Sequence, residues 1–228
     1  MPVEEQKDTP GVVLSQSEWQ VNVCELPNVS SSQTLVAGVD EVGRGALFGP
    51  VVAAAVILPT SALPQLALAG VKDSKQLSRL QRTRLAQEIQ RLAIDWRIGY
   101  ATRDEIDRLN ILQASLLAMK RAILKLKVQP DLCLIDGKQS LPDFPLPQQT
   151  MIKGDERSLE IASASVVAKV WRDELIVRFA LKYPDYDLVA NKGYGTQRHR
   201  LALDQYGPSR QHRMSFSPCQ VRKSQGAI

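Results

Sequence analysis

Two apolar runs, separated by a glycine-rich turn, dominate the first third of the hydropathy pattern. They cover residues 34–40 and 50–58, and the second run is apolar on both faces, as in a strand buried inside a sheet. Shorter apolar runs at residues 96–101, 132–136 and 150–153 predict three further strands. The pattern therefore predicts five strands that include a buried one.

Helical patterns lie between these strands and begin at recognisable caps. Ser78 with Gln81, and Thr102 with Glu105, have the spacing of capping boxes. The first box predicts a helix that ends near residue 93, and the second predicts one long helix that ends near residue 127. A third helix is expected over residues 158–181, and its small apolar start favours close packing on a sheet.

The long second helix carries a core-facing stripe in which apolar residues recur every three or four positions. Its members are Leu109, Leu112, Leu116, Met119, Ile123 and Leu126. Strands followed by helices interleaved with later strands predict an α/β domain, a mixed β-sheet flanked by helices. We divide the chain into a disordered leader (1–33), a main domain (34–182), a small C-terminal region of turns and a short helix (183–218), and a tail (219–228).

Composition is that of an ordinary globular protein, with 228 residues, 44% of them hydrophobic and 23% charged. The formal net charge is +5, from 29 basic and 24 acidic residues. A mild positive excess is compatible with a nucleic-acid partner, but many unrelated proteins share it.

The cysteines and the apolar runs bear on the compartment. Cys24, Cys133 and Cys219 are widely separated and have no metal-ligand spacing, which favours a reducing environment. The longest apolar run, residues 51–58, is far shorter than the roughly 20 residues of a membrane helix. The first residues carry acids where a signal peptide carries positive charge. We expect a cytoplasmic monomer without membrane contact.

Four acidic residues lie at the ends of predicted strands. Asp40 and Glu41 end the first, Asp136 ends the fourth, and Asp155 follows the fifth and directly precedes the third helix. Functional groups in open α/β sheets gather beyond the carboxyl ends of strands. Clustered carboxylates remain ionised together only around a strong cation, and oxygen ligands suit Mg²⁺ or Mn²⁺. The set therefore predicts a divalent-metal site.

Each acid also has a simpler interpretation. Asp155 is in a position to cap the following helix, and Asp136 with Gly137 is a common turn pair. For Asp40 and Glu41 a simpler interpretation is harder, because unpaired acids are seldom buried. Gly43, Arg44 and Gly45 follow them, and glycines there favour a backbone surface shaped for a polyanion.

Six blocks of the chain together resemble ribonuclease HII, the type 2 ribonuclease H family. They are AGVDEVGRGALFGPVVAAAVIL (37–58), VKDSKQLS (71–78), LIDGK (134–138), KGDERSLEIASASVVAKVWRD (153–173), KGYGT (192–196) and HRMSF (212–216). The blocks match in order and rough spacing and extend over residues 34–218. The resemblance implies a ribonuclease H-like fold with a small helical C-terminal region.

The implied activity is endonucleolytic hydrolysis of RNA in RNA/DNA hybrids and of ribonucleotides embedded in duplex DNA. The family cuts 5′ of the ribonucleotide by two-metal-ion catalysis and leaves 3′-hydroxyl and 5′-phosphate ends. By motif, its metal-binding acids are Asp40, Glu41, Asp136 and Asp155. The resemblance also implies that the 43–45 loop contacts the ribose 2′-hydroxyl, largely through backbone groups.

Other substrate contacts are assigned from the same blocks and from charge. Tyr194 matches the family tyrosine that senses the deoxyribose after the ribonucleotide. Lys75 and Lys169 are candidate phosphate contacts, although solvated lysines are common. Ser158 is positioned either to donate to a phosphate or to join the first helical turn.

Three further residues are not expected to take part in catalysis, and Asp173 is expected to be structural. Asp173 lies eighteen residues after Asp155, five helical turns away, so we expect it far from the metals. His212, with Arg213, is expected to hold the C-terminal segment or touch the DNA backbone. Neither His212 nor His199, the remaining histidine, is expected to act as a general base.

Two alternatives remain open at this point. Ribonuclease HIII carries a substantial N-terminal substrate-binding domain, for which the leader here is too short and polar. A catalytically silent nucleic-acid binding protein of the same fold is the second, and the presence of all four acids argues against it.

Overall fold

The computed structural model describes residues 34–72 and 76–220. The predicted leader, most of the predicted tail and Lys75 lie outside the described residues. Five strands form one sheet, as the sequence predicts, in the order β3-β2-β1-β4-β5. They are β1 (Val36–Val42), β2 (Val51–Ile57), β3 (Asp95–Ala101), β4 (Leu132–Asp136) and β5 (Gln148–Met151).

The sheet is mixed, as expected. Strands β1, β2 and β3 are antiparallel neighbours, whereas β4 runs parallel to both β1 and β5. The described residues contain these helices: α1 (Leu63–Leu68), α2 (Arg79–Leu92), α3 (Arg103–Leu109), α4 (Ile111–Leu124), α5 (Gly154–Arg157), α6 (Leu159–Ala180), α7 (Leu188–Asn191) and α8 (Gln197–Tyr206). Both predicted capping boxes are present, at the starts of α2 and α3.

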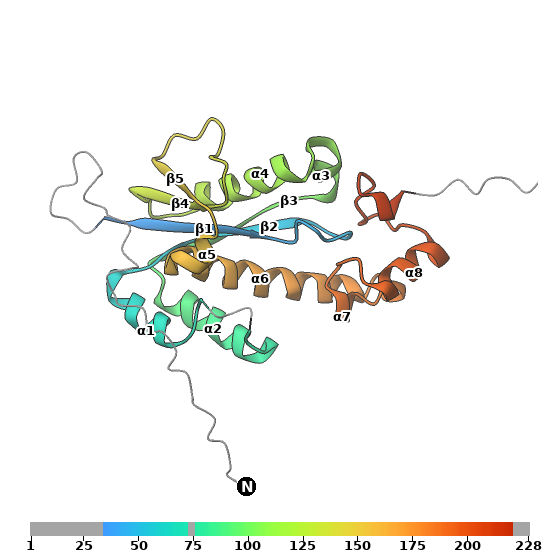
Figure 1. Ribbon diagram of the computed structural model, residues 1–228, viewed down its shortest axis with the longest axis horizontal. Coiled ribbons are helices and arrows are strands. Elements are labelled where there is room, and N and C mark those ends of the chain that lie inside the picture. The colour runs from blue at the N-terminus through green and yellow to red at the C-terminus, as the bar shows by residue number, and fades with distance from the viewer. Residues whose placement is uncertain (1–33, 73–75, 221–228) are drawn as a thin grey trace, which may run out of the picture.

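The helices form layers on both faces of the sheet. Figure 1 shows α3 and α4 over one face and α6 along the other, with α1 and α2 on the outer side of α6. Strand β2 is buried along its whole length because it contributes to both interfaces. Ala53 and Ile57 belong to the core cluster that includes α4, and Ala54 and Val56 belong to the cluster that includes α2 and α6.

Two glycines set the distance between helices and sheet. A Cβ added to Gly38 in β1 would lie 2.0 Å from the backbone of Glu160, at the start of α6. A Cβ added to Gly99 in β3 would lie 2.1 Å from the carbonyl oxygen of Ala118 in α4. Backbone contacts as close as these tolerate no side chain, so both glycines are steric requirements of the fold.

The prediction of one long helix from residue 102 to 127 is wrong. The helix breaks at Asn110, whose φ of 75° is in the left-handed region. Its side-chain oxygen accepts hydrogen bonds from the backbone amides of Leu112 and Gln113 and so caps α4. Asparagine tolerates this conformation better than most residues, and its cap stabilises the new helix. The later members of the predicted stripe, Leu116, Met119 and Ile123, are buried as expected.

The C-terminal segment packs against the end of α6 and the loop after β1. Phe48, Ile176, Tyr186 and Leu203 are members of one buried cluster there. The segment is also anchored to α3, since the Asp107 carboxylate accepts hydrogen bonds from the backbone amides of Met214 and Ser215. No helix in the described part of the chain has the length and apolar character needed to cross a membrane.

Gly38→Ala should destabilise the protein by about 1–3 kcal/mol or more, because α6 must move off β1 to admit a methyl group. Thermal or denaturant unfolding measures the loss. Gly45→Ala is the matched control, since a Cβ there meets nothing within 4 Å. Equal stability losses in the two variants would contradict this account of the β1–α6 contact.

Candidate active site

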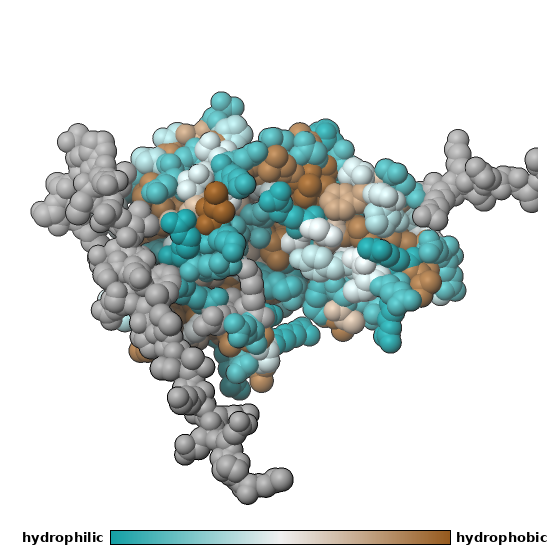
Figure 2. All heavy atoms as spheres, viewed as in Figure 1, coloured by the Kyte–Doolittle hydropathy of each residue, from teal (hydrophilic) through white to brown (hydrophobic). Residues whose placement is uncertain are grey.

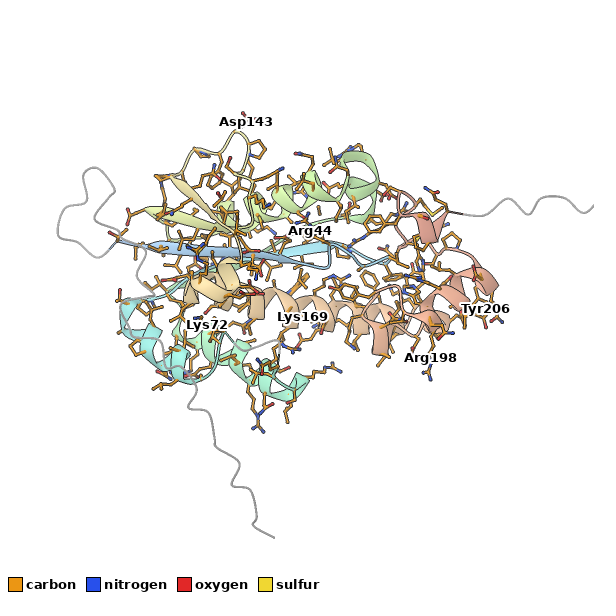
Figure 3. All side chains as sticks on the ribbon, in the orientation of Figure 1. Arg44, Lys72, Asp143, Lys169, Arg198 and Tyr206 are labelled. Atoms are coloured by element: carbon orange, nitrogen blue, oxygen red, sulfur yellow. The ribbon has the colours of Figure 1, made fainter. Side chains whose placement is uncertain are left out.

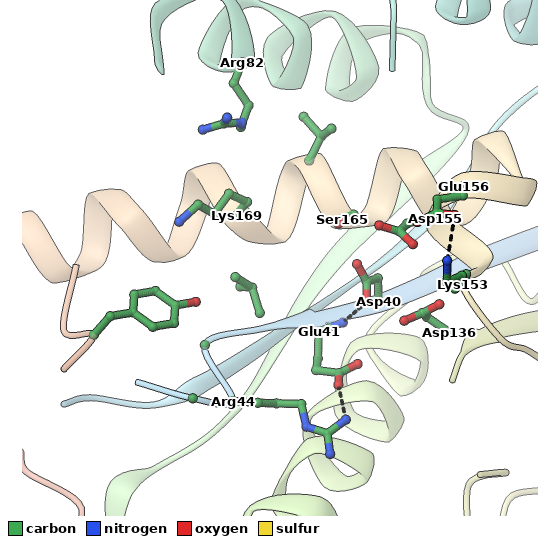
Figure 4. Close-up of a pocket in the computed structure, with 15 residues that line it drawn as sticks. Asp40, Glu41, Arg44, Arg82, Asp136, Lys153, Asp155, Glu156, Ser165 and Lys169 are labelled. Atoms are coloured by element: carbon green, nitrogen blue, oxygen red, sulfur yellow. Dashed lines mark hydrogen bonds and ion pairs between the residues drawn. The ribbon is translucent and has the colours of Figure 1, made fainter. Parts of the chain in front are cut away.

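The parallel pairing of β1 with β4 brings three acids together. Val39 pairs with Ile135, and the next residues on the two strands are Asp40 and Asp136. These two acids therefore lie side by side at one edge of the sheet. Asp40, Glu41 and Asp136 each offer a carboxylate oxygen, and these oxygens lie within 4.8 Å of one another. Figure 4 shows their side chains converging on one space beside α6. The structure thus places three of the four predicted acids in a group that is suited to a cation.

The fourth acid reaches the same cleft through the turn after β5. The backbone amide of Gly154 donates to Asp136 Oδ1 over 2.7 Å, which fixes this turn against the end of β4. Asp155 follows in the short helix α5 and lines the cleft with the other three acids. The expectation that Asp155 directly precedes the long helix is wrong, because α5 intervenes. The cap of α6 is Ser158, so the capping alternative for Asp155 is also wrong.

The electrostatics of this group are unfavourable without a counter-charge. Burial, followed by the charge of Glu41, raises the pKa of Asp40 well above its usual range, and Asp136 adds to the increase. A hydrogen bond from Ser165 on α6 partly offsets it. Burial also raises the pKa of Glu41, against the opposing charge of Arg44. Close carboxylates that are largely shielded from water repel one another when ionised.

The donor set fits a divalent cation. Glu41 Oε1 accepts a hydrogen bond from Arg44 over 3.0 Å, but Glu41 Oε2 is buried and has no hydrogen-bond partner among the described residues. An unpartnered buried carboxylate oxygen is costly unless a cation or a donor reaches it. Among the described residues, this group consists of carboxylates without a histidine or cysteine, which is the ligand set that Mg²⁺ or Mn²⁺ prefers.

A buried arginine packs against the Gly43–Gly45 loop. Arg172 on α6 is fully buried and donates to the backbone carbonyls of Phe48, Pro50 and Lys192 over 2.9 to 3.2 Å. A Cβ at Gly43 would lie 2.1 Å from Arg172 Nε, and Gly43 has a φ of +89°. Gly43 is therefore required both by its conformation and by the guanidinium packed against it.

Arg213 supports the same loop from the C-terminal segment. It is fully buried and donates to the carbonyls of Gly49 and Arg44 over 2.9 and 2.8 Å. Of the two roles expected for His212 and Arg213, this geometry of Arg213 agrees with the first, which is to hold the C-terminal segment in place. The Arg44 side chain, in contrast, is half-exposed and forms an ion pair with Glu41.

Tyr194 lines the same cleft as the acids. Its ring has Lys169 Nζ 5.7 Å and Arg172 Cζ 5.5 Å from its centroid, and its backbone forms an isolated bridge with Ala46. Lys169 lines the cleft and forms an ion pair of 2.8 Å with Asp173. The expectation that Asp173 is structural agrees with this pairing.

Ser158 has a structural role in this arrangement. It is 1% exposed, its hydroxyl accepts from the backbone amide of Ile161 and donates to Glu160, and it is not among the residues found to line the cleft. Its predicted phosphate contact receives no support from this position. Lys75, the other predicted contact, lies outside the described residues.

Sequence reasoning missed Ser165 and Arg172. Ser165 lies within the small apolar start of α6, which reads as a packing surface, and Arg172 lies among ordinary helical residues. A serine one helical turn from Lys169 was the available signal for Ser165, since both then share a helix face. For Arg172 no local signal exists, because its partners Phe48 and Pro50 are more than 120 residues away in the chain.

The acids, the loop and Tyr194 line one open cleft of about 660 Å³. Figures 2 and 3 show hydrophilic side chains across the centre of this face, where Arg44 and Lys169 lie. Lys153, Arg82 and Lys169 add positive charge to the rim. The cleft therefore combines a carboxylate group suited to metal ions with basic side chains suited to an anion.

Comparison with known proteins agrees with this chemistry. The family model described as ribonuclease HII matches residues 37–219. A ribonuclease HII of Trichormus variabilis is 65% identical over 195 residues, which cover 86% of this chain and 87% of that protein.

Two solved structures share the fold. Ribonuclease H2 from Pyrococcus horikoshii OT3 is similar with a TM-score of 0.71 and 26% identity over 82% of this chain and 95% of that one. Ribonuclease HII from Archaeoglobus fulgidus, solved in a complex with PCNA, has a TM-score of 0.64 and 29% identity over 75% of this chain and 86% of that one.

Asp40→Asn should raise the thermal midpoint of the metal-free protein at neutral pH. The folded-state pKa of Asp40 is raised above the ordinary value of 3.8, so ionisation opposes folding as the pH rises through the folded pKa. Below pH 3.8 the carboxyl is neutral in both states, and the advantage of the variant should vanish. Each kcal/mol gained in the free energy of unfolding should raise the thermal midpoint by about 2–4 °C for a domain of this size.

Melting curves between acid and neutral pH, with and without Mg²⁺, measure this effect. Mg²⁺ should stabilise the wild-type protein more than Asp40→Asn. Asp143→Asn is the control, since Asp143 is exposed and lies away from the cleft (Figure 3). If Asp40→Asn melts at a lower temperature than the wild type at neutral pH, the ionised Asp40 carboxylate does not oppose folding and the prediction is wrong.

Proposed function

The chain belongs to the ribonuclease HII family, a family of hydrolytic nucleases that act on RNA/DNA substrates, and we propose that it cuts on the 5′ side of ribonucleotides embedded in duplex DNA as well as within RNA/DNA hybrids. The main support is that the clustered acids, the Gly43–Gly45 loop and Tyr194 line the same cleft. In this proposal, these groups contact the scissile phosphate and the sugars on either side of it.

The acids have the role of metal ligands in this proposal. Asp40, Glu41, Asp136 and Asp155 would hold divalent ions, Mg²⁺ or Mn²⁺, and the unpartnered Glu41 Oε2 is a ready ligand atom. Two such ions, when bound, activate water and stabilise the leaving 3′-oxygen, which leaves 3′-hydroxyl and 5′-phosphate ends. Arg44 restrains Glu41 through Oε1, and Ser165 restrains Asp40.

The loop supplies recognition of the ribose. Gly45 is exposed, and a Cβ there would meet nothing within 4 Å, so a sugar has room to approach the main chain at this position, whereas Gly43 is buried against Arg172. Only a ribonucleotide offers a 2′-hydroxyl to the backbone groups of Gly43, Arg44 and Gly45. Because Arg44 is engaged with Glu41, we assign recognition to the backbone of this loop.

Tyr194 supplies recognition of the next nucleotide. Tyr194 lines the cleft, where a sugar without a 2′-hydroxyl would pack against its ring. Lys169, beside the ring, is suited to a neighbouring phosphate. We accordingly assign the region 183–218 to substrate binding and the region 34–182 to catalysis, in a protein that works as a cytoplasmic monomer.

The second candidate is a catalytically silent binding protein of the same fold. Clustered carboxylates repel the phosphates of a nucleic acid, so a pure binder gains nothing from them. The raised pKa of Asp40 and the unpartnered oxygen of Glu41 are disadvantages that metal-dependent catalysis explains. The hydrolase is therefore the better supported function.

A duplex DNA that contains one ribonucleotide tests the proposal directly. With Mg²⁺ or Mn²⁺, the wild-type protein should produce a single nick on the 5′ side of the ribonucleotide. Asp136→Asn should lower turnover by more than about 100-fold, since even partners of metal ligands cost 10–100-fold when removed. Asp143→Asn should retain full activity. Tight binding without cleavage by the wild type would favour the silent binder, and full cleavage by Asp136→Asn would contradict the metal-site assignment.

Tyr194→Ala should lower kcat/KM for the single-ribonucleotide duplex by about fivefold or more relative to an RNA/DNA hybrid, because ring contacts with nucleotides contribute about 1–3 kcal/mol. Tyr194→Phe, which keeps the ring, should retain most of the selectivity. Competition between the two substrates in one reaction measures the ratio. An unchanged ratio in Tyr194→Ala would remove the junction-reading role.

A further inference from the structure

Two buried histidines lie behind Tyr194 and outside the cleft. His199, in α8, and His212, in the C-terminal segment, are both fully buried. Neither lines the cleft, so direct contact with substrate is not their role. Their Nε2 atoms face each other at 2.9 Å, and this pairing joins two segments that are thirteen residues apart in the chain.

The hydrogen bonds around the pair run in one direction. The backbone amide of Ser209 lies 2.9 Å from His212 Nδ1 and must donate to it, so Nδ1 carries no proton. Neutral His212 then carries its proton on Nε2 and donates to His199 Nε2. His199 in turn carries its proton on Nδ1, which donates to the carbonyl oxygen of Tyr194 over 2.9 Å.

The surroundings keep both rings neutral and fixed. The His212 ring contacts the rings of Phe48 and Tyr186, with centroids 5.0 and 4.6 Å away. Burial lowers the pKa of His199, and burial followed by repulsion from His199 lowers the pKa of His212 to about 3. A second proton would set Nδ1–H of His212 against the Ser209 amide, or Nε2–H of His199 against Nε2–H of His212, so the direction of the hydrogen bonds is fixed at neutral pH.

We propose that His199 and His212 are positioning residues for Tyr194, and that their directed hydrogen bonds set the selectivity for a ribonucleotide-to-deoxyribonucleotide junction. This inference rests on the proposed function, in which Tyr194 reads the nucleotide after the ribonucleotide. The Tyr194 carbonyl accepts from His199 Nδ1 and from the backbone amide of Thr196. Loss of the imidazole donor would release the loop that carries the ring.

The two ring nitrogens of His199 can be tested separately. The side-chain NH2 of asparagine reaches the position of Nδ1 and can donate there, and the side-chain oxygen of glutamine reaches that of Nε2 and can accept there. His199→Asn therefore keeps a donor to the Tyr194 carbonyl and loses the bond to His212. His199→Gln keeps the bond to His212 and loses the donor to Tyr194. Each variant removes one hydrogen bond from the buried cluster, so the stabilities of the two variants should fall by similar amounts.

The readout is the ratio of kcat/KM for the single-ribonucleotide duplex to kcat/KM for an RNA/DNA hybrid. His199→Gln should lower this ratio by about fivefold, the change that corresponds to one hydrogen bond, and His199→Asn should stay within about twofold of wild type. Tyr186→Phe is the control for a structural effect, because it removes the hydrogen bond to the Gly207 carbonyl from the same cluster. Its ratio should not change.

Nitrogen-15 NMR of the imidazoles tests the hydrogen bonds without any activity measurement. The proton should lie on Nδ1 of His199 and on Nε2 of His212 at neutral pH. The opposite tautomers, or equal ratios for His199→Asn and His199→Gln, would overturn the inference. If Tyr194→Ala changes the ratio and His199→Gln does not, only the inference fails. If Tyr194→Ala has no effect, the junction-reading function itself fails.

Discussion

The buried guanidinium of Arg172 is the contact on which the geometry of the cleft depends. It joins α6 to the loop after β1 and to the turn before Tyr194, through three backbone carbonyls. Its partners are carbonyls, and it forms no ion pair with any described residue. Burial lowers the pKa of Arg172. Burial, followed by repulsion from Arg172, lowers the pKa of Arg213 to about 9. Arg172 and Arg213 are thus buried cations that pack against the Gly43–Gly45 loop with little compensating charge, and their positive charge favours the binding of an anionic ligand at this loop.

The clustered acids of the cleft also oppose folding, because burial disfavours their charged forms as it does those of the two arginines. Three carboxylates meet because the parallel register of β1 and β4 leaves no other position for Asp40 and Asp136. Apolar clusters cover both faces of the sheet, and their burial stabilises the fold enough to offset the repulsion between these carboxylates. The candidate active site is thus locally unfavourable for folding, and the remaining structure holds it in place.

In the proposed function, substrate recognition is divided among segments that are distant in the chain. The Gly43–Gly45 loop belongs to the first hairpin, and Tyr194 belongs to the C-terminal region. Their relative position is set by Arg172, by the carboxylate of Asp107 and by the histidine pair. Each of these contacts uses a side chain to hold backbone groups, which restrains position more firmly than contacts between two flexible side chains.

The sequence by itself determined the strands, the capped helix starts and the four acids, because these depend on neighbours a few residues away. It failed where a choice depended on distant packing. Asn110 breaks a pattern that continues through it, and Ser158 takes the cap that Asp155 also suited. Only the tertiary structure decided that Arg172 lies under Gly43 and that the two histidines meet, since those contacts join residues whose spacing in the chain carries no periodic signal.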